Sequence, residues 1–486
     1  MSSPVLSREG IGQGRPSSPL REEWPAPIIV LEAITRFVPP ETIRAVLTQT
    51  GRHSQRIRRL PATAVVWLVM AIGIWSDLDI PAIFRQVVGT LRSLLLILSK
   101  KRPPCKAALS QARTRLGACC LRQLFLRTAG PIALDRTRDA FYKGLRLMAI
   151  DGVSFDIPDT PPNAKAFGRP VTRRYGEPVD GGYPQIHVIF LSETGTHVIA
   201  EAFVKRGKRG ELPLAGSLLR KVPQGSLVLW DRGFYGYRSL DEARRRSVHV
   251  LGRVPDQVGF EVVRTLGDGS CLATIYPTGR DRRHRTNGLI VRVIEYTFDD
   301  PNRPGHGERH RVVTTLLDAD LFPAAELVVL YHERWEIEIG NDELKTHQLD
   351  RLVHLRSRTP CGVLQELYGI LLAYNAVRFL MHEAALSVDL DPRRLSFIHA
   401  VRVLRETAPL LRAAATERLP FLYAAMIQHI AQGRLPPRDN RINPRVVKKK
   451  MSNPSHLRTC FPKKRPEHCH PPQPQTSFEQ AVVILK

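Results

Sequence analysis

The spacing of apolar residues makes the first part of the chain helical. Between residues 27 and 135 they recur every three or four positions, as on one face of an α-helix. The predicted helices lie at 27–38, 41–50, 62–74 and 81–98. A further run, "KAALSQARTRLGACCLRQLFLRTAG", is interrupted at Gly117, with Arg113 and Arg115 predicted to be exposed beside the break. It is compatible with a helix–turn–helix that presents both arginines to DNA, and equally with an ordinary helical hairpin.

The pattern changes to that of strands at residue 145. "LRLMAIDGVSFDIP", "PQIHVIFLSE" and "THVIAEAFVK" are rich in β-forming residues, and Thr194-Gly195 predicts a tight turn between the last two. Helices and strands then alternate through residue 255. Three strands followed by such alternation predict a mixed sheet with helices packed on it.

The pattern is again that of strands over residues 256–318, which indicates a β-subdomain inserted into the mixed fold. From Pro323 a single long helix is predicted to run to about His347, and further helices at 364–385 and 395–415. After about residue 433 the chain becomes basic and proline-rich, which indicates either a solvated tail or a phosphate-binding arm.

Charge narrows the choice of partner. The chain has 486 residues, with 72 Lys and Arg against 46 Asp and Glu, a net charge of +26. Such a balance favours a polyanion, either nucleic acid or an anionic membrane surface. The longest apolar stretch, residues 62–75, is too short to cross a bilayer, so we expect no membrane partner. The seven scattered cysteines favour a reducing cytoplasm over a disulfide framework.

Two aspartates lie in unusually apolar surroundings. Asp151 falls inside the strand "LMAIDGVSF", where a carboxylate is costly unless it binds a metal, pairs with a base or titrates. Asp231 ends the apolar strand "SLVLWD", a favoured place for catalytic groups in mixed sheets, although it could equally begin a turn. Asp156 and Asp159 lie near Asp151 and are weaker candidates.

The third candidate acid lies in "YHERWEIEIGNDELK", residues 331–345. With about 100° per residue, Tyr331, Arg334, Glu338 and Lys345 fall within roughly 60° of one another on a continuous helix. Pairing of charges four residues apart could produce the same stripe on a solvated helix. Glu333, Glu336 and Glu343 lie off the stripe and are predicted to be solvated.

Together, two aspartates on neighbouring strands and one glutamate on a packed helix could hold two divalent cations about 4 Å apart on a phosphodiester. Mg²⁺ suits carboxylate and phosphate oxygens, and we expect Mn²⁺ to substitute for it. Arg334 and Lys345 would meet flanking phosphates, while Tyr331 and Trp335 offer flat faces for a displaced base. A basic chain with this cluster indicates DNA cleavage and joining.

The motif Y-x2-R-x3-E-x6-K, met by Tyr331, Arg334, Glu338 and Lys345, resembles the signature of the insertion-element-four family of bacterial DDE transposases. "AIDGVSFDIPDTPPNAKAFG" and "LVLWDRGFYGY" resemble the family's first and second aspartate blocks, and the resemblance spans roughly residues 27–450 in order. One departure is Trp230, which precedes Asp231 where a small residue is expected.

The resemblance implies an α/β fold: a ribonuclease-H-like catalytic core with an inserted β-subdomain, an all-α N-terminal domain before it and C-terminal helices after it. The implied divisions are a disordered segment 1–26, a helical DNA-binding domain 27–140, the core in two parts at 141–255 and 321–390 around an insertion at 256–320, helices at 391–433, and a basic tail at 434–486.

By the same resemblance Asp151, Asp231 and Glu338 are the catalytic, metal-binding triad, and Tyr331, Arg334 and Lys345 contact the transposon end near the cut. The implied activity is cut-and-paste transposition through terminal inverted repeats, with a possible hairpin intermediate for which Trp335 is the first candidate base platform. The implied partners are double-stranded transposon ends, target DNA and a second copy of the chain, in the bacterial cytoplasm and on the nucleoid when bound. A catalytically inactive DNA-binding relic and a host nuclease with the same core remain the alternatives.

Overall fold

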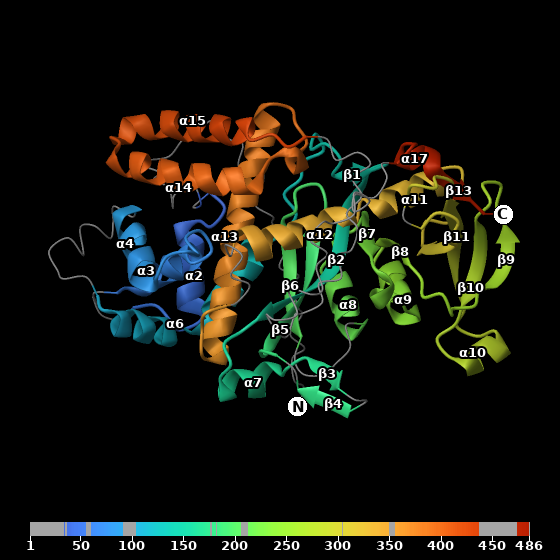
Figure 1. The fold of residues 1–486 in the computed structure, drawn as a ribbon, viewed down its shortest axis with the longest axis horizontal. Helices are drawn as coiled ribbons and strands as arrows, with labels where there is room; N and C mark the ends of the chain where they lie inside the picture. The colour runs from blue at the N-terminus through green and yellow to red at the C-terminus, as the bar shows by residue number, and fades with distance from the viewer. Residues whose placement is uncertain are drawn as a thin grey trace, which may run out of the picture.

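The computed structural model describes residues 34, 36–54, 60–90, 104–174, 177–180, 182–205, 212–303, 305–348, 355–436 and 474–485. A layer of helices lies beside a large β-sheet, and the long helix α13 stands between them (Figure 1). The predicted disordered segment 1–26 and most of the predicted basic tail lie outside the described residues. Within the described part, no helix combines the length and the apolar character needed to span a membrane.

The main sheet contains eleven strands in the described part of the chain. They are β1 (Phe141–Tyr142), β2 (Leu145–Asp156), β5 (Gln185–Glu193), β6 (Ile199–Lys205), β7 (Ser226–Trp230), β8 (His249–Arg253), β9 (Glu261–Thr265), β10 (Cys271–Ile275), β11 (Leu289–Phe298), β12 (His310–Thr314) and β13 (Val482–Ile484). A separate hairpin consists of β3 (Val171–Arg174) and β4 (Glu177–Asp180).

The first five long strands have the order β6-β5-β2-β7-β8. β2 pairs antiparallel with β5 and parallel with β7, and β7 pairs parallel with β8. An antiparallel hairpin arm beside a parallel half, with the first strand in the centre, is the ribonuclease-H-like arrangement, so the predicted fold class is confirmed.

The predicted insertion does not form a sheet of its own. β12 pairs antiparallel with β8, and the order continues β12-β11-β10-β9, so these strands extend the core sheet. The basic loop between β10 and β11 contains a short helix, α10 (Gly279–His284), which begins at the capping side chain of Thr278.

Both faces of the core sheet are covered, which explains the nearly continuous apolar runs of its strands. On β2, Met148 and Ile150 pack under α8 (Leu212–Leu219) and α9 (Tyr237–Arg245). Leu147 and Ala149 point the other way, toward α11 (Ala324–His332). Adjacent side chains alternate between the two cores because the side-chain period of a strand is two.

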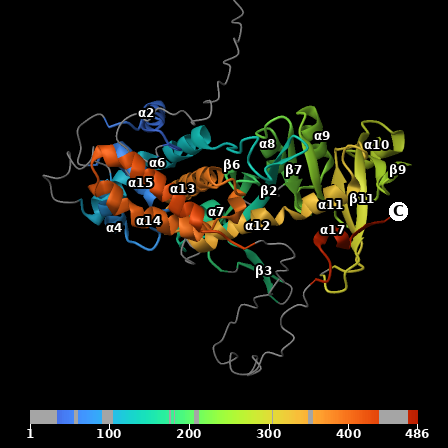
Figure 2. The same ribbon diagram turned by 90° about the horizontal axis from the view of Figure 1, so that it is seen from above.

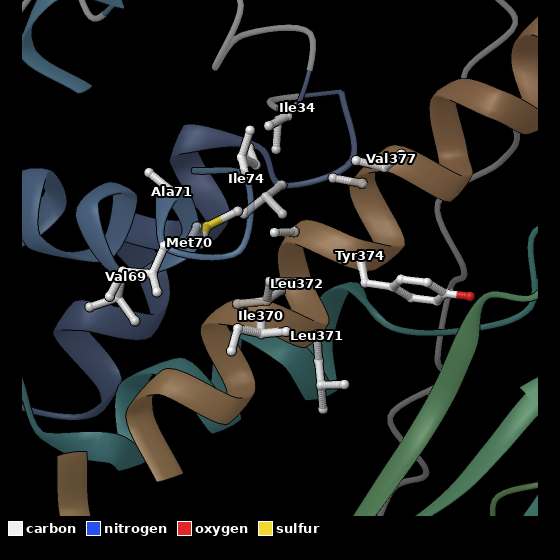
Figure 3. Packing of buried hydrophobic residues seen from close by; sticks show 14 of the residues in the cluster. Ile34, Val69, Met70, Ala71, Ile74, Ile370, Leu371, Leu372, Tyr374 and Val377 are labelled. Carbon is white, nitrogen blue, oxygen red and sulfur yellow. The ribbon is translucent and has the colours of Figure 1, made fainter. Parts of the chain in front are cut away.

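The N-terminal and C-terminal helices share one core. They are α2 (Pro40–Gln49), α3 (Ala62–Ala71), α4 (Ile80–Thr90), α6 (Lys106–Thr128), α13 (Pro360–Ser387), α14 (Phe397–Ala413) and α15 (Leu419–Gln432), with the short α7 (Pro161–Phe167) at the sheet edge. Figure 3 shows Val69, Met70 and Ala71 of α3 against Ile370 and Leu372 of α13. The apolar stretch around α3 is therefore explained by burial on all sides.

The helix predicted from residue 323 is divided into segments. α11 ends at His332, α12 (Trp335–Asp342) follows after Glu333 and Arg334, and a π-helical segment, η2 (Glu343–Gln348), completes it. Together they run along the sheet toward the helical layer (Figure 2).

The end of the predicted basic tail is part of the fold, so a solvated tail or phosphate-binding arm is wrong for residues 474–485. They form the short helix α17 (Phe478–Ala481) and the strand β13, which pairs antiparallel with the end of β11. The carboxylate of Asp300 accepts hydrogen bonds from the backbone N–H groups of Gln475 and Thr476, 3.0 and 3.2 Å long. Phe478 packs against Phe298 with 5.3 Å between ring centroids.

Candidate active site

The two candidate aspartates lie at the same edge of the sheet. Ile150 of β2 is paired in parallel register with Trp230 of β7, so Asp151 and Asp231 each follow at the same level of neighbouring strands. β7 stops at Trp230, and Asp231 begins a short 3₁₀ turn, Arg232–Phe234. Parallel pairing thus brings together two acids that are 80 positions apart in the printed sequence.

The departure at Trp230 is accommodated by the next strand. Trp230 is fully buried, and its register partner on β8 is Gly252. A Cβ atom at Gly252 would lie 1.9 Å from Cδ1 of Trp230, so only glycine leaves room for the indole. The small residue expected before Asp231 is replaced by a large one whose space is provided by β8, and Trp230 has a packing role.

Arg334 joins Glu338 to the two aspartates. Its Nη2 donates to Oε1 of Glu338 over 3.1 Å, and its side chain is 11% exposed. Burial lowers the pKa of Arg334, but Tyr331 and the carboxylates of Glu338, Asp231 and Asp151 outweigh burial and raise it. The guanidinium of Arg334 therefore interacts electrostatically with all three acids. Its Nε has no hydrogen-bond partner among the described residues.

The surroundings of Asp151 change the pKa of its carboxyl group. Burial raises its pKa, and the neighbouring carboxylates of Glu338 and Asp231 add to the rise, while the N–H of Gly152 and the charge of Arg334 oppose it. A buried carboxyl surrounded by like charges binds a cation or a proton more readily than an exposed one.

The predictions from sequence missed Asn341. Its Nδ2 donates to Oδ2 of Asp151 over 2.6 Å. Helical spacing could have identified it, because on a continuous helix Asn341 lies only about 60° from Glu338 and 20° from Arg334. The candidates predicted from that stripe are all charged or aromatic, and an amide is neither.

Tyr331 and Lys345 lie on either side of the acids. Tyr331 is buried, and burial raises the pKa of its hydroxyl, which lies beside Arg334 and Asp231. Burial lowers the pKa of Lys345, whereas Asp151, Asp156 and Asp342 oppose the lowering. Its Nζ lies 5.9 Å from the centre of the Phe155 ring. The stripe predicted for a continuous helix therefore faces the aspartates despite the segmentation.

Three further candidates have different outcomes. The side chain of Trp335 lies outside the described residues, so its role stays a prediction. Arg113 was predicted to be exposed, and this is wrong: it donates to Oε1 of Gln365 over 3.0 Å and to Oγ of Ser357 over 3.1 Å. It faces the packed helix α13. Arg115 is exposed, and the predicted break is present because Gly117 has a φ of 72°.

The prediction that Glu333, Glu336 and Glu343 are solvated is wrong for Glu336 and Glu343, whereas the side chain of Glu333 is 37% exposed. Glu343 is buried and paired with Arg378 of α13. Oε2 of Glu336 lies 3.2 Å from Nε2 of His197, and Oε2 of Glu333 lies 3.3 Å from Nη1 of Arg393. The reason is that the second face of this helix is covered by α13, by the residues just after it and by the turn between β5 and β6.

The weaker aspartate candidates are engaged elsewhere. Asp156 accepts a 2.7 Å hydrogen bond from Nε2 of Gln185, and Asp159 is paired with Arg169. The charge of Asp156 nevertheless opposes the lowering of the Lys345 pKa by burial.

The donor set suits divalent cations that bind through oxygen. Asp151, Asp231 and Glu338 supply carboxylates, the ligands that Mg²⁺ and Mn²⁺ prefer. Among the described residues no three acidic, histidine or cysteine side chains converge closely enough to form a closed metal site. Glu338 is instead bonded to Arg334, whose charge compensates the cluster.

Comparisons with known proteins agree with these features. A family model described as the N-terminal part of the insertion element 4 transposase matches residues 29–126, and one described as a transposase DDE domain matches residues 142–376. Transposase InsG for insertion sequence element IS4 of Escherichia coli (strain K12) is 32% identical over 425 residues, which cover 86% of this chain and 92% of that protein.

A more distant likeness is to a cryo-electron-microscopy structure of piggyBac transposase in a synaptic complex with hairpin DNA. The TM-score is 0.38 at 10% sequence identity, with 91% of this chain and 94% of that chain covered. This likeness is too distant to assign roles to individual residues.

Proposed function

Because this chain belongs to the insertion-element-four family of DDE transposases, we propose that Asp151, Asp231 and Glu338 are the acids with which it cuts and joins DNA strands. The observation that carries the proposal is the placement of Asp151 and Asp231 at one sheet edge, with Arg334 beside both and bonded to Glu338. As a bacterial insertion-element transposase, the protein is an enzyme of DNA cleavage and strand transfer.

The three acids would hold two divalent cations, Mg²⁺ or, as a substitute, Mn²⁺. Bound there, the cations would supply activation of a water molecule or a 3′-hydroxyl group and stabilisation of the leaving oxygen of the phosphodiester. The chain's own contribution is to keep the carboxylates apart and oriented. Arg334 compensates their charge and holds Glu338 through its 3.1 Å hydrogen bond.

DNA contacts near the cut fall to the remaining side chains of the motif. Lys345 is partly exposed beside Asp151 and would meet a flanking phosphate. Arg334 and Tyr331 are nearly buried, so we assign them to the DNA strand that enters the site rather than to duplex outside it. Trp335 is the candidate platform for a base displaced during hairpin formation.

Binding of the duplex outside the site falls to the helical layer. Arg115 is exposed on α6, whereas Arg113 holds α6 against α13. The net charge of +26 suits the long polyanionic partners of this reaction, the inverted repeats at the element's ends and the target DNA. We propose a DNA-bound homodimer that pairs two ends, in the cytoplasm and on the nucleoid when bound.

The deciding experiment compares wild-type protein with Glu338→Gln on a duplex that carries the element's own terminal repeat. We expect wild type to cut this duplex in Mg²⁺, and Glu338→Gln to retard it equally in a gel without cutting it. Glu336→Gln is the matched control, because Glu336 lies on the same helix but faces His197. It should cut as wild type does.

Three results would contradict the proposal. Cutting by Glu338→Gln at the wild-type rate would remove Glu338 from the site. Binding without cutting by wild type, in Mg²⁺ and in Mn²⁺, would identify a catalytically inactive relic, and equal cutting of unrelated duplexes would identify a nuclease.

A further inference from the structure

Asn341 contacts an acid of the site but has no part in the signature motif. It lies on α12 one turn after Glu338, and its Nδ2 donates to Oδ2 of Asp151 over 2.6 Å. We propose that Asn341 is a positioning residue that holds the Asp151 carboxylate in its metal-binding orientation and thereby sets the affinity for divalent cations. This inference rests on the proposed function of Asp151 as a ligand.

The orientation of this contact follows from chemistry. An ionised carboxylate only accepts hydrogen bonds, so the nitrogen of the Asn341 amide must face Asp151. The carboxylate has about four lone-pair sites on two oxygens, and Asn341 occupies one of them. Cations can use the others, so the hydrogen bond and the metal do not compete for the same position.

The backbone of Asn341 is well supported, which makes the side chain suitable for positioning. The adjacent Gly340 lies so close to the helical layer that a Cβ there would be 3.3 Å from Oη of Tyr374 and 3.6 Å from Nδ1 of His197. Asn341 lines a cavity of about 10 Å³ together with Gly340, His197 and Tyr374, which is at the lower limit of what one water molecule needs and leaves little room for movement. The helix therefore has little freedom to withdraw the amide.

One helix thus carries both a ligand and the residue that orients another ligand. Any shift of α12 along the sheet would move Glu338 and Asn341 together, so the geometry of Asp151 and Glu338 is coupled. Hydrogen-bond partners of metal ligands typically contribute a factor of about 10–100 to metal affinity.

The chain offers a matched control, a second amide whose carboxylate partner lies on the same strand as Asp151. Gln185 donates from Nε2 to Oδ1 of Asp156 over 2.7 Å, so it is also an amide bonded to a carboxylate of β2. Asp156 is not assigned to the metal. Gln185→Ala removes the same kind of bond five residues from Asp151 and reports any general loosening of β2.

The experiment measures Mn²⁺ binding without turnover. Full-length wild type, Asn341→Ala and Gln185→Ala are each bound to a pre-cleaved end duplex, and free Mn²⁺ is followed by electron paramagnetic resonance. We expect Asn341→Ala to weaken Mn²⁺ binding by about 10–100-fold and to raise the Mg²⁺ concentration for half-maximal cleavage by a similar factor. Retardation of end DNA without metal, and Mn²⁺ binding by Gln185→Ala, should equal wild type.

The results separate the inference from the proposed function. Wild-type Mn²⁺ affinity in Asn341→Ala overturns the inference and leaves the site assignment intact, as does an equal loss in Gln185→Ala. Failure of wild type to bind Mn²⁺ overturns the function itself. If Asn341→Ala does not fold, Asn341→Ser keeps a shorter donor and should give an intermediate affinity; wild-type affinity in that variant also overturns the inference.

Discussion

Replacing Arg378 with methionine should strongly destabilise the helical layer. Arg378 and Glu343 are both buried, and they form an ion pair between α13 and η2. Nη2 of Arg378 also donates to Nδ1 of His197 over 2.5 Å, and Oη of Tyr374 donates to Glu343 over 3.2 Å. The variant leaves the Glu343 carboxylate buried without its cation.

The magnitude follows from the pKa of Glu343. Burial alone would raise it, but the charge of Arg378 and the neighbouring His197 outweigh burial and lower it from the ordinary 4.5 to about 2. A difference of about 2.5 pKa units corresponds to roughly 3 kcal/mol. Removing one partner of a buried ion pair typically costs about 3–5 kcal/mol, which agrees.

The sign of the pH dependence is also determined. A carboxyl group with a depressed folded-state pKa contributes stability that is fully present above its unfolded pKa, here 4.5, and that is lost as the pH falls toward 2. The wild type should therefore lose this contribution between about pH 4.5 and 2. Arg378→Met should lack that part of the acid dependence.

Urea-induced unfolding at pH 7 measures the effect. We expect Arg378→Met to lose about 3–5 kcal/mol of unfolding free energy, and the double variant Arg378→Met/Glu343→Leu to lose much less, because it buries no unpaired charge. Arg138→Met is the matched control: Arg138 pairs with Asp389 at the surface, and its loss should not be measurable. A loss below about 1 kcal/mol in Arg378→Met, or an additive loss in the double variant, would refute the reasoning.

Three further predictions concern Gly252 of β8, His332 of α11 and Phe478 of α17. Gly252→Ala should lower the unfolding free energy, measured in urea, by about 1–3 kcal/mol, because the new Cβ would lie 1.9 Å from Cδ1 of Trp230. Adding Trp230→Leu to this variant should recover part of the lost free energy. If it recovers none, this clash is not the cause. Burial lowers the pKa of His332 from 6.5 to about 3, so the unfolded state takes up a proton first and the unfolding free energy should fall as the pH drops from 6.5 toward 3. His332→Gln should flatten that slope, and an unchanged slope would contradict the assignment. Phe478→Ala should lower the unfolding free energy by about 2 kcal/mol, roughly half the loss for a fully buried phenylalanine. It should also raise the pKa of His332, whose ring centroid lies 4.4 Å from that of Phe478. A titration of the His332 ring by NMR measures this pKa, and an unchanged value would show that Phe478 does not shield the ring from water.

Local patterns predicted the elements and the acids. The β-forming residues of "LRLMAIDGVSF" located β2, and the carboxylate within this apolar run identified Asp151 as a candidate. The stripe of Tyr331, Arg334 and Glu338 was also predictable, because three or four residues separate its successive members and helical geometry fixes their directions.

Long-range packing could not be predicted in this way. Glu343 was assigned to solvent because its own helix turn gives no sign of Arg378, which reaches it from α13. Arg113 was assigned to the surface for the same reason, since its partners Gln365 and Ser357 lie about 250 positions later. The sequence around a charged residue does not reveal a buried partner from a distant part of the chain. The spacing of apolar residues, in contrast, shows directly which face of a helix or strand is buried.

The pairing of β13 with β11 has a consequence for the order of synthesis. Ile484 pairs with Tyr296, roughly 190 positions earlier, and a ribosome adds about 5–20 residues per second. During synthesis the end of β11 therefore lacks its partner strand β13 for on the order of 10–40 s, the time the ribosome needs to reach β13. A chain released before residue 474 would carry all three acids on an unfinished sheet, so interrupted synthesis would yield a protein with the proposed catalytic groups present and an exposed strand end that invites aggregation.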